Sequence, residues 1–368
     1  MKNFLDFTAE TLSEDLINAG FQKFVSKQLL DWIYKKHEFD LDKWNNVSKK
    51  CREYIKENYT FDLPKVVFHI QSVDGTRKFL VKFDDGETVE TVIIPARNRL
   101  TQCISSQVGC AIGCTFCHTG TMGLKRHLRA GEITGQFMAV TLWLKENVHP
   151  DERLTNIVFM GQGEPLHNYK NVKSATENFL NQNMFGLGQR KVTLSTSGLV
   201  PKIKMLHDFP PVNIAISLHA AHNDTRTELM PINKNYDLER LFEAIKTIPL
   251  KAHRRITYEY LLIAGVNDKK SDVEALARLL DRSESKINLI PFNEYPGSDY
   301  RRPSNKQILW FMDQMCKKGF TCTIRATKGE DILAACGQLK SEYEKLNLWD
   351  HSVEIRKKEV PQTEAPTV

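Results

Sequence analysis

The chain has 368 residues, of which 41% are hydrophobic and 26% are charged, as in an ordinary globular protein with one large domain and a small appendage or with two domains. It contains no apolar run of ~18 residues, and its N-terminus lacks the apolar core of a secretory signal, so we expect a cytoplasmic protein without a membrane span. The formal net charge of +6 suits a polyanionic partner such as RNA, although many proteins without such a partner are as basic.

Residues 1–62 are predicted to form a small helical, RNA-binding domain. Phe21, Val25, Leu29 and Trp32 recur near helical spacing and would form the apolar face of one helix. The other face of this helix carries four lysines, namely Lys23, Lys27, Lys35 and Lys36. A solvated basic face is the ordinary interpretation of this pattern, and an RNA-docking surface is the alternative.

Residues 63–98 are predicted to form a β-hairpin extension that leads into the main domain. From Val66 to Pro95, short apolar runs are separated by Asp74-Gly75 and by Asp85-Gly86. An Asp-Gly pair between apolar runs is a strong hairpin signal, because tight hairpin turns require the positive φ that glycine adopts easily.

Residues 99–348 alternate between strand-like and helix-like patterns. The predicted strands are Thr101–Val108, Asn156–Met160, Lys191–Thr196, Asn213–His219, Thr257–Ile263 and Lys286–Phe292. Helical patterns follow most of them, at Gly131–Lys145, Val172–Asn181, Leu238–Ile248 and Lys270–Leu280. Repeated β-then-α units favour an α/β fold with a parallel sheet, and six units suit a barrel or partial barrel.

The C-terminal part begins with a seventh strand-like run, Thr321–Ala326. A last helix is predicted around Asp331–Leu346. Residues 349–368 are predicted to be a disordered tail, because they contain few apolar residues that could join a core.

Three of the eight cysteines lie within eight positions, directly after the first predicted barrel strand. Cys110, Cys114 and Cys117 have the spacing CxxxCxxC, with the aromatic Phe116 before the last cysteine. Thiolates are the ligands of iron–sulfur clusters, and a [4Fe–4S] cluster needs four ligands. Three cysteines therefore leave one iron open, and an open iron can chelate the amino and carboxylate groups of S-adenosylmethionine (SAM). This spacing is the signature of radical SAM enzymes.

A structural zinc site is the alternative interpretation of these cysteines. Zinc normally takes four protein ligands, often from two paired knuckles. The sequence contains no second CxxC pair, since Cys316 and Cys322 are distant from the loop and six positions apart. The pattern therefore favours the iron–sulfur cluster.

Other short motifs fall at the predicted ends of barrel strands, where enzymes of this architecture carry their chemistry. They are GQGEP at 161–165, STSG at 195–198, SLH at 217–219 and Asn293. Each motif alone is as typical of a turn or a helix cap as of a binding site. Their shared location at one rim predicts a cofactor pocket.

Taken together, these motifs resemble the RlmN/Cfr family of radical SAM RNA-adenosine methyltransferases. The resemblance extends from about residue 20 to 345. It is carried by Glu90-Thr-Val, Cys103-Ile-Ser-Ser-Gln-Val-Gly-Cys110, the CxxxCxxC loop, GQGEPL at 161–166, STSG at 195–198, SLHA at 217–220, NLIPFN at 288–293 and Ala335-Cys336-Gly-Gln-Leu. It implies a partial (βα)6 barrel with an N-terminal helical RNA-binding domain.

The resemblance also implies a reaction that consumes two molecules of SAM, because C2 and C8 of adenine are electron-poor and do not attack a SAM methyl group. In the family, a cysteine that matches Cys336 accepts a methyl group from one SAM. A second SAM is split reductively into methionine and a 5′-deoxyadenosyl radical, which removes hydrogen from this methyl group, and the carbon radical adds to the adenine. A thiol that matches Cys103 then attacks Cys336 and forms a transient disulfide bond, and a carboxylate that matches Glu90 accepts the ring proton.

The resemblance implies further site residues. Cys110, Cys114 and Cys117 match the cluster ligands. The implied SAM contacts are Gly163, Glu164, Ser195, Ser217, Leu218, His219 and Asn293. The remaining thiols, Cys51, Cys316 and Cys322, match no functional position. His118 and Gln162 depart from the family pattern, which usually has a small residue and a methionine there, but neither departure removes a residue that the mechanism needs.

A basic segment, Lys125-Arg126-His127 with Arg129, follows the cluster loop and would either hold RNA phosphates or be a solvated loop.

Several residues resemble the branch that methylates adenosine C2 in 23S ribosomal RNA and adenosine 37 of tRNA. They are STSG, SLHA, Thr327-Lys-Gly-Glu-Asp331, Val108 and Thr115. C8 methylation of 23S ribosomal RNA, as in the Cfr branch, and a non-catalytic zinc-bound RNA-binding protein are the alternatives. We further expect a flavodoxin- or ferredoxin-type electron donor and a monomer.

Overall fold

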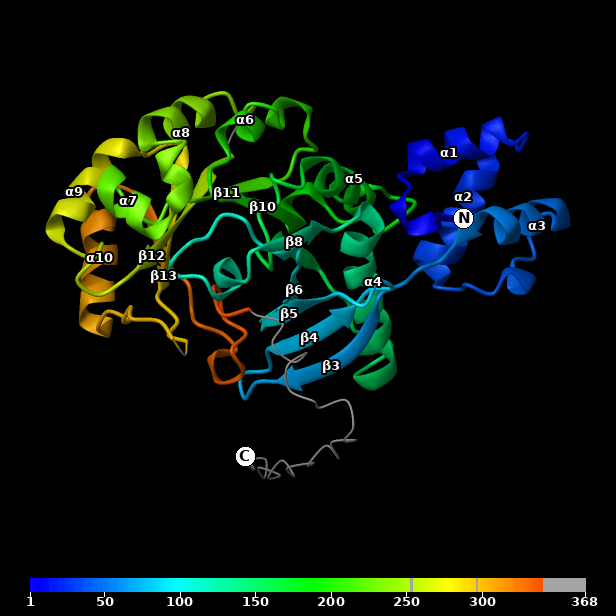
Figure 1. Cartoon of the computed structure of the whole chain (residues 1–368), viewed down its shortest axis with the longest axis horizontal. Helices are drawn as coiled ribbons and strands as arrows, with labels where there is room; N and C mark the ends of the chain where they lie inside the picture. Colours follow the sequence, from blue (N-terminus) through cyan, green and yellow to red (C-terminus); the bar gives the residue numbers. More distant parts are fainter. Residues whose placement is uncertain (252–253, 296, 340–368) are drawn as a thin grey trace, which may run out of the picture.

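The computed structural model describes residues 1–251, 254–295 and 297–339. A curved sheet forms its centre, helices cover one side of this sheet, and a group of N-terminal helices lies at one end (Figure 1). The predicted tail at 349–368 lies outside the described residues. Within the described part of the chain, no helix is both long enough and apolar enough to cross a bilayer.

The N-terminal unit is helical, as predicted. Its elements are β1 (Lys2–Asn3), η1 (Phe4–Asp6), α1 (Ala9–Asn18), α2 (Phe24–Leu30), η2 (Asp31–Lys36), η3 (Leu41–Lys43), α3 (Lys49–Asn58) and β2 (Tyr59–Thr60). The predicted apolar face is confirmed, since Val25, Leu29 and Trp32 are buried. These side chains belong to a cluster that also includes Met138 and Met184 of the main domain. The two parts of the chain therefore share one hydrophobic interface.

The segment after the N-terminal unit forms three antiparallel strands, β3 (Lys65–Gln71), β4 (Arg77–Lys82) and β5 (Thr88–Ala96). The turns fall at the predicted Asp-Gly pairs, where Gly75 has a φ of 82° and Gly86 a φ of 89°. Strand β5 pairs with the first barrel strand, so this extension continues the main sheet. The sheet order is β14-β13-β12-β11-β10-β9-β6-β5-β4-β3.

The barrel strands are parallel, which confirms the predicted α/β fold with a partial barrel. They are β6 (Arg99–Cys103), β9 (Asn156–Phe159), β10 (Val192–Thr196), β11 (Asn213–Ser217), β12 (Ile256–Leu262), β13 (Ser285–Pro291) and β14 (Thr321–Ile324). The helices between them are α4 (Ala130–Asn147), α5 (Tyr169–Leu180), α6 (Val200–Ile203), α7 (Asn223–Leu229), α8 (Leu238–Ile245), α9 (Lys270–Leu279) and α10 (Asn305–Lys317). The short helical turns are η4 (His118–Met122), η5 (Gln189–Lys191), η6 (Leu206–Asp208), η7 (Pro231–Lys234) and η8 (Glu330–Ile332).

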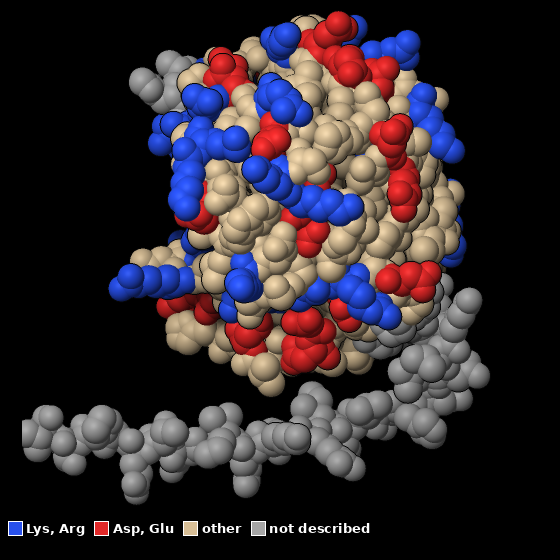
Figure 2. All heavy atoms as spheres, turned by 90° about the vertical axis from the view of Figure 1, so that its left-hand side faces the viewer, with Lys and Arg blue, Asp and Glu red and all other residues tan. Residues whose placement is uncertain are grey.

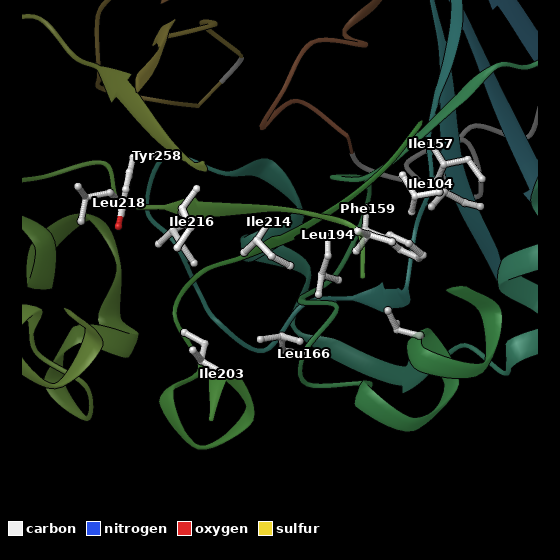
Figure 3. Packing of buried hydrophobic residues seen from close by; sticks show 14 of the residues in the cluster. Ile104, Ile157, Phe159, Leu166, Leu194, Ile203, Ile214, Ile216, Leu218 and Tyr258 are labelled. Atoms are coloured by element: carbon white, nitrogen blue, oxygen red, sulfur yellow. The ribbon is translucent and has the colours of Figure 1, made fainter. Parts of the chain in front are cut away.

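Successive side chains along a barrel strand point alternately to the hydrophobic core and to the barrel interior. In β10 and β11, Leu194, Ile214 and Ile216 pack into the core on the helical side of the sheet, with Ile203 of α6 (Figure 3). Because successive strand residues point to opposite faces, Ser195 and the other residues between them face the barrel interior.

The first predicted strand, Thr101–Val108, is wrong in its second half. Strand β6 ends at Cys103, and a separate antiparallel pair begins with β7 (Gln107–Gly109), which pairs with β8 (Leu124–His127). Ser105 leaves the main sheet because its hydroxyl donates to the Glu90 carbonyl (2.6 Å). The run Thr101–Val108 contains no glycine or proline at this break, so the sequence alone does not reveal it.

The predicted last helix, Asp331–Leu346, is also wrong within the described residues. One short turn, η8, is followed by loop, and residues 340–346 lie outside the described part of the chain. Gly329, Leu333 and Gly337 have positive φ angles of 66°, 50° and 83°, which a right-handed helix does not allow. The result is a loop that carries Cys336 to the barrel interior.

Met138 of α4 tests how strongly the barrel holds the N-terminal unit, because its side chain is 1% exposed and packs into the N-terminal cluster. Met138→Ala should lower the free energy of unfolding by about 2–5 kcal/mol, since it leaves a cavity at this interface. Urea denaturation followed by tryptophan fluorescence measures the change. The control, Met205→Ala, removes a methionine that is 37% exposed and should cost less than about 1 kcal/mol. Equal losses in both variants would contradict the interface.

Candidate functional site

The three clustered cysteines lie on the loop that links β7 to η4. Gly109 begins this loop with a φ of 76°, and a Cβ atom there would lie 1.8 Å from the Gly123 carbonyl oxygen. The Cys110 N–H donates to the same carbonyl (2.8 Å), and the Cys117 N–H donates to the Cys114 carbonyl (3.2 Å). The loop is therefore folded back on itself and directs three thiols toward one space.

These thiols line a cavity inside the barrel, which we call the first cavity. Its lining residues are Cys110, Ile112, Cys114, Phe116, Cys117, Thr119, Phe159, Met160, Gly161, Gly163, Glu164, Pro165, Ser195, Thr196, Ser197, Ser217, His219, Met230, Glu259, Leu261, Ile290, Phe292, Arg325, Cys336 and Gly337. Most of the residues expected to contact SAM thus surround the same space as the expected cluster ligands.

The three thiols at this cavity are the residues that would hold a metal group. A zinc ion requires ligands that meet at one point, about 2.3 Å from each sulfur. Among the described residues, no three His, Cys, Asp or Glu side chains are close enough to hold one ion. Burial raises the pKa of Cys114 and of Cys117, and it raises that of Cys110 to about 12. A metal group bound here would therefore displace three thiol protons.

The glycine-rich turn after β9 packs directly against the start of the cysteine loop. A Cβ atom at Gly161 would lie 2.7 Å from the Ile104 carbonyl carbon, and one at Gly163 would lie 2.6 Å from the Gln107 Cβ. Gly163 also has a φ of 103°. Only glycine fits at these two positions, so the turn lies against both the cavity and the cysteine loop.

Glu164 follows this turn and is almost fully buried. Its Oε1 accepts from the Leu166 N–H (3.0 Å), and its Oε2 accepts from the Ser197 N–H (2.7 Å). Its own N–H donates to Gln107 Oε1 (2.7 Å). Burial raises the pKa of the carboxyl group, while the hydrogen bonds lower it. Glu164 is thus a fixed acceptor that links two strand ends at the cavity wall.

The strand ends at β10 and β11 place Ser195, Ser217 and His219 at the first cavity, as predicted. Leu218 differs, because its side chain is fully buried in the core and does not line the cavity. Its backbone N–H donates to the Glu259 carbonyl (3.0 Å), so only its main chain supports the site.

His219 adopts a left-handed backbone conformation, with a φ of 59°. Burial, with Arg226 as a smaller cause, lowers its pKa to about 3, so the imidazole is neutral at physiological pH. Nδ1 accepts from the Leu261 N–H (3.1 Å), and the ring packs edge-to-face on Phe116 at 4.9 Å. His219 therefore joins the cysteine loop to the end of β12.

Arg226 of α7 was not expected from the sequence. Its guanidinium is fully buried and donates to the carbonyls of Ser197 (2.7 Å), Leu218 (3.2 Å) and Ser217 (3.4 Å), and to Asn233 Oδ1 (2.9 Å). One cation thus holds both serine-containing strand ends in register. Its acceptors are 7 to 29 positions away, so no local pattern could have revealed this role.

A second cavity lies beside the first. Its lining residues are Ile94, Pro95, Ala96, Cys103, Met160, Ile290, Asn293, Arg325, Ala326, Thr327, Lys328, Ala334, Ala335, Cys336 and Leu339. Four of them, Met160, Ile290, Arg325 and Cys336, also line the first cavity. Cys336 therefore lies in the wall between the two cavities.

The second cavity contains two further predicted site residues. Cys103, at the end of β6, is buried and faces it, and burial raises the pKa of this thiol to about 12. Asn293 lines this cavity and not the first one; its Nδ2 donates to the Cys336 carbonyl (3.2 Å), and its Oδ1 accepts from the Thr327 hydroxyl (3.1 Å). Asn293 thus holds the loop that carries Cys336.

Glu90 lines neither cavity. It is fully buried on β5, and its Oε1 lies 3.1 Å from Lys78 Nζ in an ion pair. Lys78 also donates to the Leu333 carbonyl (3.3 Å), three residues before Cys336. The Glu90 N–H donates to Gln162 Oε1 (3.1 Å), which gives Gln162 a structural contact that a methionine could not make in the same way.

His118 packs against the loop that carries Cys336. Its N–H donates to the Gly337 carbonyl (2.7 Å), and its ring stacks on Tyr295 at 4.9 Å. This departure from the family pattern therefore has packing partners beside the cluster loop.

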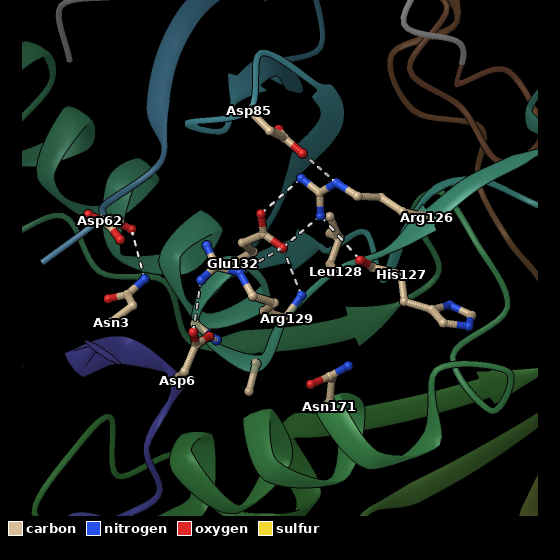
Figure 4. Close-up of polar contacts among 12 residues, drawn as sticks. Asn3, Asp6, Asp62, Asp85, Arg126, His127, Leu128, Arg129, Glu132 and Asn171 are labelled. Atoms are coloured by element: carbon tan, nitrogen blue, oxygen red, sulfur yellow. Dashed lines mark hydrogen bonds and ion pairs between the residues drawn. The ribbon is translucent and has the colours of Figure 1, made fainter. Parts of the chain in front are cut away.

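The basic segment after the cluster loop is ion-paired within the protein. Arg126 contacts both Glu132 (2.9 Å) and Asp85 (2.6 Å), and Arg129 contacts Asp6 (3.0 Å) (Figure 4). Lys125, which Figure 4 does not draw, pairs with Glu87 (2.9 Å). The Asp6 carboxylate also accepts from the Gly131 N–H (2.8 Å) at the start of α4. These contacts support a structural role for the segment, since they join the N-terminal unit, α4 and the turn before β5.

The face in Figure 2 shows that Lys and Arg side chains form several separate groups, with Asp and Glu side chains between them. On this face, the basic side chains are thus dispersed among acidic ones rather than gathered in one patch.

Comparison with known protein families matches both parts of the chain. The radical SAM superfamily matches residues 104–280, and the ribosomal RNA large subunit methyltransferase N-terminal domain matches residues 2–60.

Several relatives are similar over nearly the whole chain. The dual-specificity RNA methyltransferase RlmN of Francisella tularensis subsp. novicida is 44% identical over 344 residues, which cover 92% of this chain and 93% of that protein. The protein of the same name from Campylobacter lari is 43% identical over 360 residues, covering 94% and 99%. Among solved structures, a radical SAM methyltransferase from Sphaerobacter thermophilus has a TM-score of 0.85 and 38% identity, covering 92% of this chain and 99% of that one.

Arg226→Met tests whether this arginine supports the site. The variant leaves the Ser197, Ser217 and Leu218 carbonyls without their charged donor, and each buried acceptor left unpaired costs about 1–3 kcal/mol. We expect the free energy of unfolding to fall by about 3 kcal/mol or more. Equilibrium dialysis should also show weakened SAM binding. Arg240→Met, on an exposed position of α8, should change neither quantity, and unchanged SAM binding by a folded Arg226→Met protein would refute the role.

Proposed function

Because this chain belongs to the RlmN family of radical SAM RNA methyltransferases, we propose that it methylates adenine C2 in 23S ribosomal RNA and in adenosine 37 of tRNA. The observation that carries this proposal is the position of Cys336. Its thiol lies in the wall between a cavity lined by three clustered cysteines and a cavity that contains a second thiol, Cys103. A methyl carrier between a SAM site and an RNA site requires such a position.

Cys110, Cys114 and Cys117 would hold a [4Fe–4S] cluster, and these three ligands would leave one iron for SAM. When bound, this cluster supplies the one-electron chemistry that cleaves SAM. The polar wall of the first cavity orients the cofactor: Glu164 and Ser195 with Ser217 offer acceptors and hydroxyl groups from three adjacent strand ends. The apolar lining of the rest of the cavity keeps bulk water from the reacting atoms.

Cys336 acts first as a nucleophile that accepts a methyl group from one SAM. The carbon that it carries is then joined to the adenine, with a second SAM as the source of the radical. Cys103 releases the product by attacking the Cys336 sulfur, and both residues are free thiols in the structure, as the start of this cycle requires. Two molecules of SAM are therefore consumed for each methyl group transferred.

Glu90 is the proposed acceptor of the ring proton. Its carboxylate is buried, and its Oε1 is ion-paired with Lys78 Nζ (3.1 Å). Because Lys78 also holds the Leu333 carbonyl, the loop that carries Cys336 has to open for the base to reach this carboxylate. Such an opening would break the hydrogen bonds that hold the loop, from Asn293 Nδ2 to the Cys336 carbonyl (3.2 Å) and from the His118 N–H to the Gly337 carbonyl (2.7 Å).

The proposal extends to partners and location. A flavodoxin- or ferredoxin-type protein would supply the electron, and the chain would act as a monomer. A protein that modifies ribosomal RNA and tRNA works in the cytoplasm, which is where we expect it.

Reconstitution without oxygen tests the cluster. The protein should become brown and bind about four iron and four sulfide ions per chain. Cys114→Ala should lose the cluster, whereas Cys316→Ala, which removes an exposed thiol on α10, should retain it. A colourless protein that binds one zinc ion instead would overturn the assignment.

Product analysis tests the reaction. With ribosomal RNA and tRNA transcripts, SAM and a reductant, nucleoside mass spectrometry should detect 2-methyladenosine. Cys336→Ala should abolish methyl loading of the protein and reduce product to background. Cys103→Ala should leave protein covalently attached to RNA, because the release step is lost, and Cys316→Ala should behave as the unchanged enzyme. Formation of 8-methyladenosine would favour the C8 reaction instead.

A further inference from the structure

Arg325 occupies the wall between the two cavities, together with Cys336. The residue follows β14, and its N–H still donates to the Leu289 carbonyl (2.8 Å), so the main chain is held to β13 at this point. Its guanidinium lines both cavities and donates to Met160 Sδ (3.6 Å). Neither the sequence motifs nor the family resemblance singled out this residue.

The surroundings of Arg325 are dominated by the two thiols. The pKa of the guanidinium is raised above its usual value by Cys336 most strongly, and also by Glu259 and Cys103, while burial opposes the rise. Glu259 is itself held by another contact, since its Oε2 accepts from Asn288 Nδ2 (2.9 Å). The ion pairs found among the described residues do not include Arg325.

Two other cations near the second cavity, unlike Arg325, form ion pairs with carboxylates. Lys328 lines the cavity but lies 3.8 Å from Asp74, and Lys78 lies 3.1 Å from Glu90. A carboxylate partner neutralises much of the field of a cation. Arg325 forms no ion pair of this kind among the described residues, although Glu259 lies near enough to act on its charge, and its guanidinium lines both cavities together with Cys336.

Cys103 needs such a charge. Burial raises the pKa of its thiol to about 12, Cys336 raises it further, and Arg325 lowers it. A thiol with this pKa is protonated near pH 7, yet the thiolate is the form that attacks a sulfur atom. A fixed cation in a water-poor cavity favours the thiolate and can also orient it.

We propose that Arg325 is a positioning residue for product release, and that its charge stabilises the Cys103 thiolate as this thiolate forms and attacks the Cys336 sulfur. This inference rests on the proposed function. In the release step, the Cys103 thiolate attacks Cys336 Sγ, an S–S bond forms and the bond from Cys336 Sγ to the methylene carbon on the adenine breaks. The electron pair of the broken bond stays on carbon, which takes a proton and becomes the methyl group. A thiol reductant then returns two electrons to the disulfide.

The test compares Arg325→Met and Arg325→Gln, which lose the charge, with Arg325→Lys, which keeps it. Each protein, carrying its cluster and methylated on Cys336, is mixed with tRNA, SAM and reductant, and the reductant is then removed. Denaturing gels and nucleoside mass spectrometry measure the ratio of protein–RNA adduct to released 2-methyladenosine. This ratio does not depend on how fast the earlier steps are.

We expect the ratio to rise at least about 10-fold in the two neutral variants, as a thiol pKa higher by about one unit requires, and to return most of the way to the original value in Arg325→Lys. Arg282→Met, on an exposed residue between α9 and β13, should leave it unchanged. Cys103→Ala supplies the adduct standard. Equal ratios in all Arg325 variants, with adduct in Cys103→Ala, would overturn the role of Arg325 alone. The absence of adduct from Cys103→Ala would overturn the proposed function and this inference with it.

Discussion

The site depends on close packing between the chain that leaves β6 and the glycine-rich turn after β9. The N–H groups of Ser106 and Gln107 both donate to the Gln162 carbonyl (2.9 and 3.2 Å), and the Gln162 N–H donates to the Ser105 hydroxyl (2.8 Å). Gly161 has no side chain because the Ile104 backbone occupies that space. The cysteine loop begins a few residues later, so the same contacts set the position of the thiols relative to the turn.

In the proposed reaction, the two cavities would provide two different environments. The first is lined by thiols, buried polar groups and apolar side chains, and it contains the neutral His219. The second is lined by residues of β5, of β6 and of the C-terminal loop, and its lining includes Cys103 and Asn293. The shared wall, with Cys336 and Arg325, keeps the cofactor and the proposed RNA site apart while both remain within reach of one sulfur atom.

Much of the fold and of the site follows from local sequence patterns. Short-range patterns predict the barrel strands, the Asp-Gly turns and the CxxxCxxC loop. Gly163, Ser195 and His219 follow the ends of barrel strands, where this architecture carries its chemistry, and they line one cavity. Two features did not follow from the local patterns. A loop with Leu333 and Gly337 in left-handed conformations replaces the predicted last helix, and the basic segment forms ion pairs with carboxylates of other elements. Arg226 and Arg325 were missed too, since a buried arginine is defined by its acceptors and neighbours rather than by its own segment.

The high pKa of the three clustered thiols has a consequence for the life of the protein before it receives iron. Protonated thiols react slowly with peroxides and disulfides, because oxidants attack the thiolate. The same property makes the uptake of iron and sulfide steeply dependent on pH, since three protons have to leave as the metal enters. Loading of the cluster would therefore release protons from these thiols in addition to supplying iron and sulfide.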